Sequence, residues 1–145
     1  MPIKTFRGKI PHDGIDTILL HTNNGAMGYR IVKFQVMAQD PNEDLENSVK
    51  IFTVPQTTAS VAVDFSDNTL LAAAMIWSNT SQVYVHESAI IFDNMTVNQD
   101  IYITNFDTGT AGAINYYIEL EQVTLDLNEN TVATLKDIRN VTAPT

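Results

Sequence analysis

The sequence predicts a mainly β protein, a single-domain antiparallel β-sandwich that is jelly-roll-like and carries a short C-terminal α-helix. Short runs of alternating apolar and polar residues recur along most of the chain, and turn residues separate them. Seven to nine such runs are typical of a sandwich or a small barrel. No internal repeat or low-complexity linker divides the 145 residues, so we expect one domain over residues 1–145.

The N-terminal part contains the clearest turn signal. Residues 1–10 (MPIKTFRGKI) are expected to form an N-terminal arm or an edge strand. Asn24 and Gly25 lie between TILLHT (17–22) and YRIVKFQVMA (29–38), and because both residues tolerate positive φ they predict a hairpin. In the second of these strands four apolar residues are expected to share one face: Val32, Phe34, Val36 and Ala38.

The middle of the chain supplies further β runs. VKIFTV (49–54) is followed by Pro55. In SVAVDF (60–65) the larger apolar residues Val61, Val63 and Phe65 alternate with Ala62 and Asp64. LLAAAMIW (70–77) is predicted as a strand because it is short and has polar ends, although Leu and Ala also favour a helix. Its apolar residues occupy both faces. It is therefore either a central core strand, which we favour, or a strand covered by another chain.

Three more β runs complete the predicted sheets. QVYVHESAIIFDN (82–94) and NQDIYITNF (98–106) precede the most regular strand, INYYIELEQV (114–123). This last strand alternates cleanly, as a half-buried strand does. One face is expected to be apolar, with Ile114, Tyr116, Ile118 and Leu120, and the other solvated, with Asn115, Tyr117, Glu119 and Glu121.

The tail LDLNENTVATLKDIRN (125–140) allows two interpretations, a calcium loop or a capped helix. Its acidic and amide residues match the first ligand positions of a calcium loop, but Thr131 replaces the required glycine and Asp137 the bidentate glutamate. Asp126 and Glu129 have the spacing of a capping box instead. An apolar stripe follows, formed by Val132, Leu135 and Ile138. We therefore predict a helix over residues 126–140 and no metal site.

Composition and charge exclude several classes of function. The net charge of −9, without any basic cluster, repels a nucleic-acid backbone. The chain has no cysteine for a disulfide, a zinc thiolate or a nucleophile. Its longest apolar run is too short to cross a bilayer, so no membrane partner is expected. Residues 1–50 balance six cations with six acids, whereas residues 51–145 hold two cations and eleven acids, which suggests that the two parts face different surroundings.

No motif indicates catalysis or a cofactor. The three histidines are scattered, and neighbours on a strand, such as His86 and Glu87, point to opposite faces. Asp64 with Asp67, or Glu119 with Glu121, resembles a glycosidase carboxylate pair, but solvated carboxylates on a half-exposed sheet explain both pairs better. We expect a protein that is not an enzyme and that uses no cofactor or metal.

Five segments carry a family resemblance: IKTFRGKI, GYRIVKFQVM, VDFSDNTLLAAAMIW, IIFDNMTVNQDIYIT and NYYIELEQVTLDLNENTVATLKDIRN. Together they resemble small β-rich virion structural proteins of marine tailed bacteriophages, such as cyanophages and pelagiphages. The resemblance covers almost the whole chain in the same order, and its C-terminal part is the most specific. It implies a virion role and brings no catalytic or ligand-binding residues.

Within a virion, the small self-contained domain favours a capsid decoration or cement protein that stabilises contacts between major capsid subunits. The expected partners are the major capsid protein and further copies of the chain, for example in a trimer. The expected location is the capsid exterior, after synthesis in the bacterial host cytoplasm. Lys4, Phe6, Arg7 and Lys9 are the candidate capsid contacts, because such residues can pair with acids or add a strand to a partner's sheet. The alternatives are a tail or head–tail connector component and a glycan-binding β-sandwich that recognises a receptor.

Overall fold

The computed structural model describes residues 2–22, 25–40, 42, 44–79, 84–92 and 96–126. These residues form eight β-strands and no helix. The strands are β1 (Ile3–Ile10), β2 (Gly14–Ile18), β3 (Met27–Ala38), β4 (Leu45–Phe52), β5 (Leu70–Asn79), β6 (Tyr84–Ile91), β7 (Ile101–Asp107) and β8 (Ile114–Thr124). The helix predicted for residues 126–140 lies outside the described residues, apart from Asp126.

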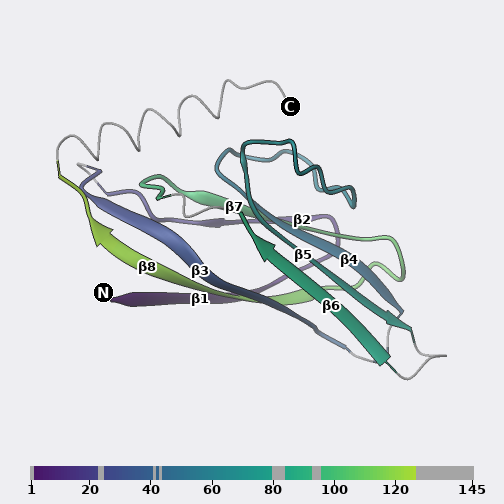
Figure 1. Ribbon diagram of the computed structural model, residues 1–145. Coiled ribbons are helices and arrows are strands. Elements are labelled where there is room, and N and C mark those ends of the chain that lie inside the picture. The colour runs from purple at the N-terminus through teal and green to yellow at the C-terminus, as the bar shows by residue number, and fades with distance from the viewer. Residues whose placement is uncertain are drawn as a thin grey trace.

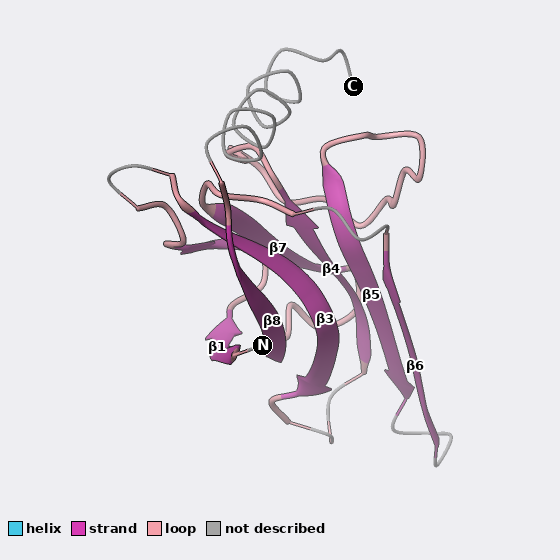
Figure 2. Ribbon diagram, turned by 60° about the vertical axis from the view of Figure 1, so that its left-hand side comes forward, coloured by secondary structure: helices cyan, strands magenta, loops and turns pink. Residues whose placement is uncertain are grey.

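The strands form two antiparallel sheets that pack against each other (Figures 1 and 2). One sheet has the order β1-β8-β3 and the other the order β2-β7-β4-β5-β6. This architecture confirms the predicted antiparallel β-sandwich. The first strand pairs with the last, the second with the seventh and the fourth with the fifth, as in a jelly roll, whereas β6, among the described residues, pairs with β5 and not with β3.

The two sheets approach each other along β3 and β6. Glu87 in β6 accepts a hydrogen bond from the backbone N–H of Val36 in β3 at 3.3 Å. At the other end of β3, Tyr29 and Val97 exchange two backbone hydrogen bonds of 2.8 Å. β1, in contrast, pairs with β8 on one side and has no strand on its other side among the described residues. Within the described ranges, this outer edge of β1 is therefore open to pairing.

The hydrophobic core lies between the sheets. Every second residue of a strand points into it, because side chains alternate between the two faces of a sheet. Ile114, Ile118 and Leu120 are fully buried, and Tyr116 is nearly so, as the alternation of β8 predicts. The residues between them are partly exposed. On the opposite sheet the core contains Val49, Ile51, Ala72, Ala74, Ile76 and Ile103.

The predicted hairpin around Asn24 and Gly25 does not form. Gly25 has the expected positive φ, 65°, but the strands on either side of it belong to different sheets. β2 pairs with β7, and β3 pairs with β8. Glycine at this position allows the chain to turn, while the pairing of distant strands decides which partner each strand takes.

A β-bulge overturns the expected face of Val32. The register of β3 against β8 shifts between Ile31 and Lys33, so that Ile31 and Phe34 both face the core. The extra residue, Val32, is 41% exposed. A bulge adds one residue to the strand and thereby interrupts its alternation, which explains the failure of the simple pattern.

The run SVAVDF (60–65), predicted as a β run, is part of an irregular connection over residues 53–69. This connection lies on the outer face of the five-stranded sheet. There the hydroxyl of Ser48 donates to the carbonyl of Val61 at 2.7 Å. Its apolar residues thus cover a sheet instead of extending one, and Val63 packs against Phe52, Leu70 and Ala73.

A buried amide network lies where β4 and β7 meet the chain after β1. The side-chain amide of Asn47 donates to Oδ1 of Asn105 at 2.7 Å. Nδ2 of Asn105 in turn donates to the carbonyl of Ile10 at 3.0 Å. Both asparagines are inaccessible to solvent. The network therefore ties β4 and β7 to the end of β1 inside the sandwich.

Candidate interaction surfaces

The alternation of β1 divides the four predicted contact residues between two faces. Phe6 faces the inner side of the sheet, opposite Ile118, and packs against the core. Lys4 is on the same side, with Nζ 5.8 Å from the ring centre of Tyr29. Arg7 and Lys9 are exposed on the outer face. The structure thus brings Arg7 and Lys9 together and separates them from Lys4 and Phe6.

The outward side chains of the three-stranded sheet form a surface that we call the basic face: Ile3, Thr5, Arg7, Lys9, Arg30, Lys33, Gln35, Met37, Asn115, Tyr117, Glu119 and Glu121. A groove of about 610 Å³ crosses one end of it, and Arg7, Lys9 and Met37 contribute to its lining. Met37 is 70% exposed. Its exposure gives the groove an apolar element beside two cations.

Part of the positive charge of the basic face is neutralised within the sheet. Arg30 forms a salt bridge with Glu121, and Nζ of Lys33 lies 4.0 Å from the carboxylate of Glu119. Arg7 and Lys9 have no ion pair among the described residues. They supply the excess positive charge of this surface.

The described cations are segregated in space. Lys4, Arg7, Lys9, Arg30 and Lys33 all belong to the three-stranded sheet. The five-stranded sheet carries a single described cation, Lys50, which is buried. The charge asymmetry along the sequence is therefore also an asymmetry between the two sheets, with the exposed cations of the described chain on one of them.

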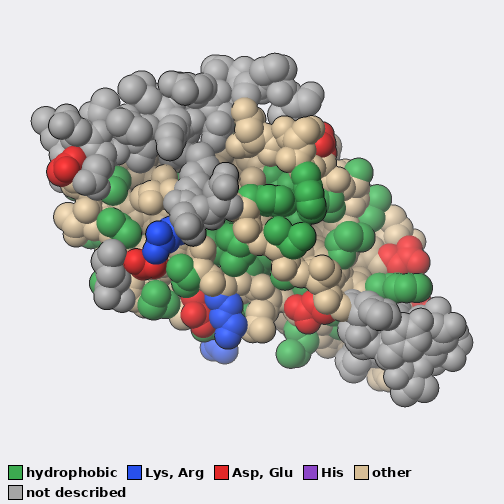
Figure 3. All heavy atoms as spheres, viewed as in Figure 1, with side chains coloured by type: hydrophobic (Ala, Val, Ile, Leu, Met, Phe, Trp, Pro, Cys, Tyr) green, Lys and Arg blue, Asp and Glu red, His purple; other side chains and the backbone are tan. Residues whose placement is uncertain are grey.

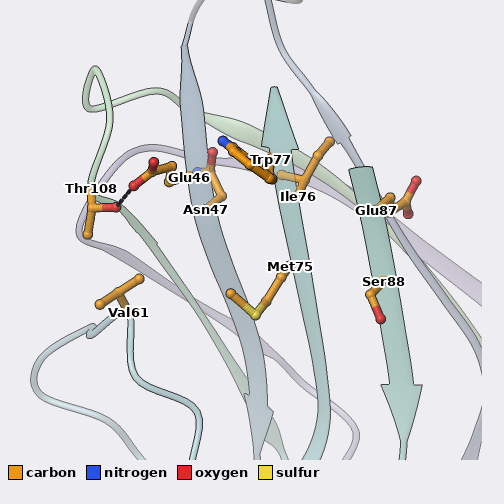
Figure 4. A pocket seen from close by; sticks show the side chains of 9 residues that line it. All are labelled: Glu46, Asn47, Val61, Met75, Ile76, Trp77, Glu87, Ser88 and Thr108. Atoms are coloured by element: carbon orange, nitrogen blue, oxygen red, sulfur yellow. Dashed lines mark hydrogen bonds between the residues drawn. The ribbon is translucent and has the colours of Figure 1, made fainter. Parts of the chain in front are cut away.

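The outer face of the five-stranded sheet contains an apolar groove. Met75 and Trp77 of β5 point away from the core and are 51% and 46% exposed. A hollow of about 390 Å³ lies against them, with Glu46, Val61 and Ser88 in its lining (Figure 4). A second hollow of about 350 Å³ continues past Met75. We define the apolar groove by its apolar side chains: Val61, Val63, Phe65, Met75, Trp77 and Ile90.

The two faces of β5, the strand that contains LLAAAMIW (70–77), differ in burial. Ala72, Ala74 and Ile76 belong to the core, as the central-strand interpretation requires. On the other face, Ala73 is covered by the connection over residues 53–69, whereas Met75 and Trp77 remain exposed. Figure 3 shows hydrophobic side chains at the surface over the region of β5 and β6. Contiguous exposed apolar groups of this kind mark contact surfaces.

A polar cavity of about 260 Å³ lies beneath the connection over residues 53–69. Its floor contains Lys50 and Thr104, which are direct neighbours across the β4–β7 ladder. Lys50 is 5% exposed, and its ammonium donates to the hydroxyl of Ser60 at 2.9 Å and to the carbonyl of Ala62 at 2.7 Å. Burial lowers the pKa of Lys50, and the charge of Asp67 partly opposes this shift.

Sequence reasoning missed this cavity. Lys50 lies within the apolar run VKIFTV, and Thr104 is an alternating residue of β7. Both positions therefore have the pattern of solvent-facing strand residues, and only the overlying connection buries them. A lysine flanked by apolar residues was the one available signal.

The carboxylates considered as a glycosidase pair, Asp64 and Asp67, serve local turns. Oδ1 of Asp64 accepts hydrogen bonds from the hydroxyl and then from the backbone N–H of Ser66, and these bonds lower the pKa of Asp64. Oδ1 of Asp67 accepts the corresponding pair from Thr69. Within the described ranges, no three His, Cys, Asp or Glu side chains are grouped to hold a metal ion. The same ranges contain no helix long and apolar enough to span a membrane.

No family model matches this chain, and no curated protein shows significant similarity to it. The fold is a β-sandwich of two antiparallel sheets. One sheet presents exposed cations, and the other presents an apolar groove.

Proposed function

We propose that this protein is a bacteriophage capsid decoration protein that stabilises contacts between major capsid subunits. The resemblance of its segments to virion structural proteins supports this role, and jelly rolls are a recurrent architecture of viral shells. The observation that carries the proposal is the presence of two different contact surfaces on opposite sheets, the basic face and the apolar groove. Two partners, the capsid and another copy of the chain, can therefore be bound at once.

The basic face with the open edge of β1 is the proposed capsid contact. Arg7 and Lys9 are exposed and can pair with acids on the shell, which gives specificity and fast association. The backbone of β1 can accept a strand of the partner along its open edge. Lysines on an edge strand also discourage pairing with strands that lack acids, so this edge selects its partner.

The apolar groove is the proposed contact between copies of the protein. Exposed residues such as Met75 and Trp77 are of the kinds enriched at the centres of protein interfaces. A symmetric shell presents many equivalent sites, which holds neighbouring copies at high local concentration. Modest affinity at each groove is then sufficient for assembly.

Binding to particles that lack the protein tests the capsid contact. The variant Arg7→Gln/Lys9→Gln should remain folded and lose most particle binding in a co-sedimentation assay. The variant Thr17→Glu/Leu19→Glu changes the net charge by the same amount at exposed positions in and beside β2, so it is the matched control. Equal binding by the two variants would contradict the assignment of the basic face.

The copy number per particle separates decoration from the tail alternatives. A decoration protein should be present in hundreds of copies that follow the capsid symmetry, and particles without it should rupture at lower temperature. A handful of copies arranged in a ring would identify a tail or connector component instead. Cryo-electron microscopy of the parent particle distinguishes these outcomes directly.

A further inference from the structure

The polar cavity beneath residues 53–69 has features that the decoration role does not explain. The connection above it is fastened to the sheet by side chains, since Ser48 donates to the carbonyl of Val61 and Lys50 to that of Ala62. Long irregular connections that are held in place in this way often form binding sites. The cavity is thus enclosed by a connection that specific hydrogen bonds hold against the sheet.

The floor of the cavity contains unused hydrogen-bonding capacity. Thr104 is 1% exposed, and its Oγ1 has no hydrogen-bond partner within the described structure. The ammonium of Lys50 uses two of its three N–H groups, for Ser60 and Ala62. A buried hydroxyl without a partner is costly, so such groups usually meet water or a ligand. Here, the two neighbouring residues Lys50 and Thr104 line the same cavity.

The walls add acceptors and apolar surface. Asp64 and Asp67 line the cavity, and each uses only Oδ1 in its turn, which leaves Oδ2 available. The ring of Phe52, with the ammonium of Lys50 5.6 Å from its centre, and the side chain of Leu70 form apolar wall. The cavity therefore combines donors, acceptors and a nonpolar wall.

The charge balance limits the class of ligand. Two carboxylates disfavour an anion, and the ammonium of Lys50 disfavours a metal ion. A neutral molecule with several hydroxyl groups suits the site, because each hydroxyl can donate to a carboxylate and accept from Lys50 or Thr104. The volume of 260 Å³ is below the roughly 300–1,000 Å³ of sites for drug-sized ligands, so it admits one ring. We propose that this cavity binds a single sugar ring.

An NMR titration of the purified protein tests the proposal. The probes are D-glucose, D-galactose, D-mannose and N-acetyl-D-glucosamine, with glycerol and sodium acetate as an acyclic polyol and an anion. At least one sugar should produce saturable shifts of the amide signals of Lys50, Phe52, Ser60 and Thr104. Thr104→Val preserves shape and should weaken that binding about tenfold, the usual effect of one lost hydrogen bond.

The control variant is Thr17→Val, which removes an exposed threonine hydroxyl from β2 of the same sheet. It should bind the sugar like the unmodified protein. Absence of saturable shifts with every sugar at millimolar concentration overturns the proposal, as do equal affinities of the Thr104→Val and Thr17→Val variants. Shifts with acetate alone would identify an anion site and would also overturn it. The assay needs no capsid, so its outcome is independent of the proposed decoration role.

Discussion

The phenol of Tyr116 in β8 donates a hydrogen bond to Oδ2 of Asp16 in β2 at 3.2 Å, and so joins the two sheets. Gly8 makes room for this contact. A Cβ atom at Gly8 would lie 2.8 Å from the Tyr116 hydroxyl. Burial, followed by the charge of Asp16 and the hydrogen bond to it, raises the pKa of Tyr116 to about 12.

The raised pKa of Tyr116 predicts a loss of stability in alkali. Tyr116 ionises near its usual value of 10.0 in the unfolded chain, whereas the folded protein keeps the proton up to about pH 12. The folded state binds more protons in this window, so the free energy of unfolding should fall as pH rises from 10 to 12, and the contribution is fully present below pH 10. Urea melts at about pH 9 and about pH 11 should show a smaller loss for Tyr116→Phe than for the unmodified protein. An identical loss would contradict the assignment.

The strands themselves were predictable because the alternation of apolar and polar residues can be recognised within each short segment of the sequence. The alternation from Ile114 to Glu121 correctly specified both faces of β8. The partners of the strands were not predictable, since the turn at Gly25 does not reveal that β2 and β3 join different sheets. Pairing is decided by contacts between residues far apart in the sequence, such as Asn47 and Asn105.

The candidate site was predictable only in part for the same reason. The basic character of residues 1–10 was visible, but the register Phe6↔Ile118 determines that Arg7 and Lys9 share the outer face. The two-sided apolar pattern of residues 70–77 favours a central core strand and leaves a strand covered by another chain as the alternative. Which of its side chains remain exposed depends on how far the connection over residues 53–69 extends.

Asn105 is expected to be essential for stability because it connects β4, β7 and the end of β1. The change Asn105→Ala removes its bonds to Asn47 and Ile10, so that Nδ2 of Asn47 keeps only its bond to the carbonyl of Gly112. We expect a loss of roughly 2–4 kcal/mol in the free energy of unfolding, measured by urea melts. Asn115→Ala, on the basic face, is the control and should change it by roughly 0.5 kcal/mol or less. Equal effects would show that the buried network is not stabilising.

Thr104→Val should stabilise the free protein. The hydroxyl of Thr104 is buried without a protein partner, and valine has nearly the same shape without the polar atom. We expect the free energy of unfolding to rise by roughly 1–2 kcal/mol. The same change should weaken sugar binding, so that stability and binding move in opposite directions. A clear loss of stability in thermal or urea melts would mean that Thr104 Oγ1 has a strong partner in the free protein.

Two exposed methionines on opposite sheets separate the two proposed contacts. Met75 lies in the apolar groove and Met37 on the basic face, and they are 51% and 70% exposed. Met75→Glu places a charge where copies are proposed to meet, and burying an unpaired charge costs enough to weaken self-association at least about tenfold. Its binding to particles should fall only through this lost cooperation between copies.

Met37→Glu should have the reverse effect. It places an acid beside Arg7 and Lys9, where it competes with the acids of the capsid partner. Particle binding by Met37→Glu should therefore weaken, while self-association, measured by analytical ultracentrifugation over a range of concentrations, stays unchanged. If Met37→Glu abolishes self-association and Met75→Glu does not, the basic face is the contact between copies and the two assignments must be exchanged. Because both positions are solvent-exposed strand residues and receive the same substitution, a general effect on folding would alter the two variants alike.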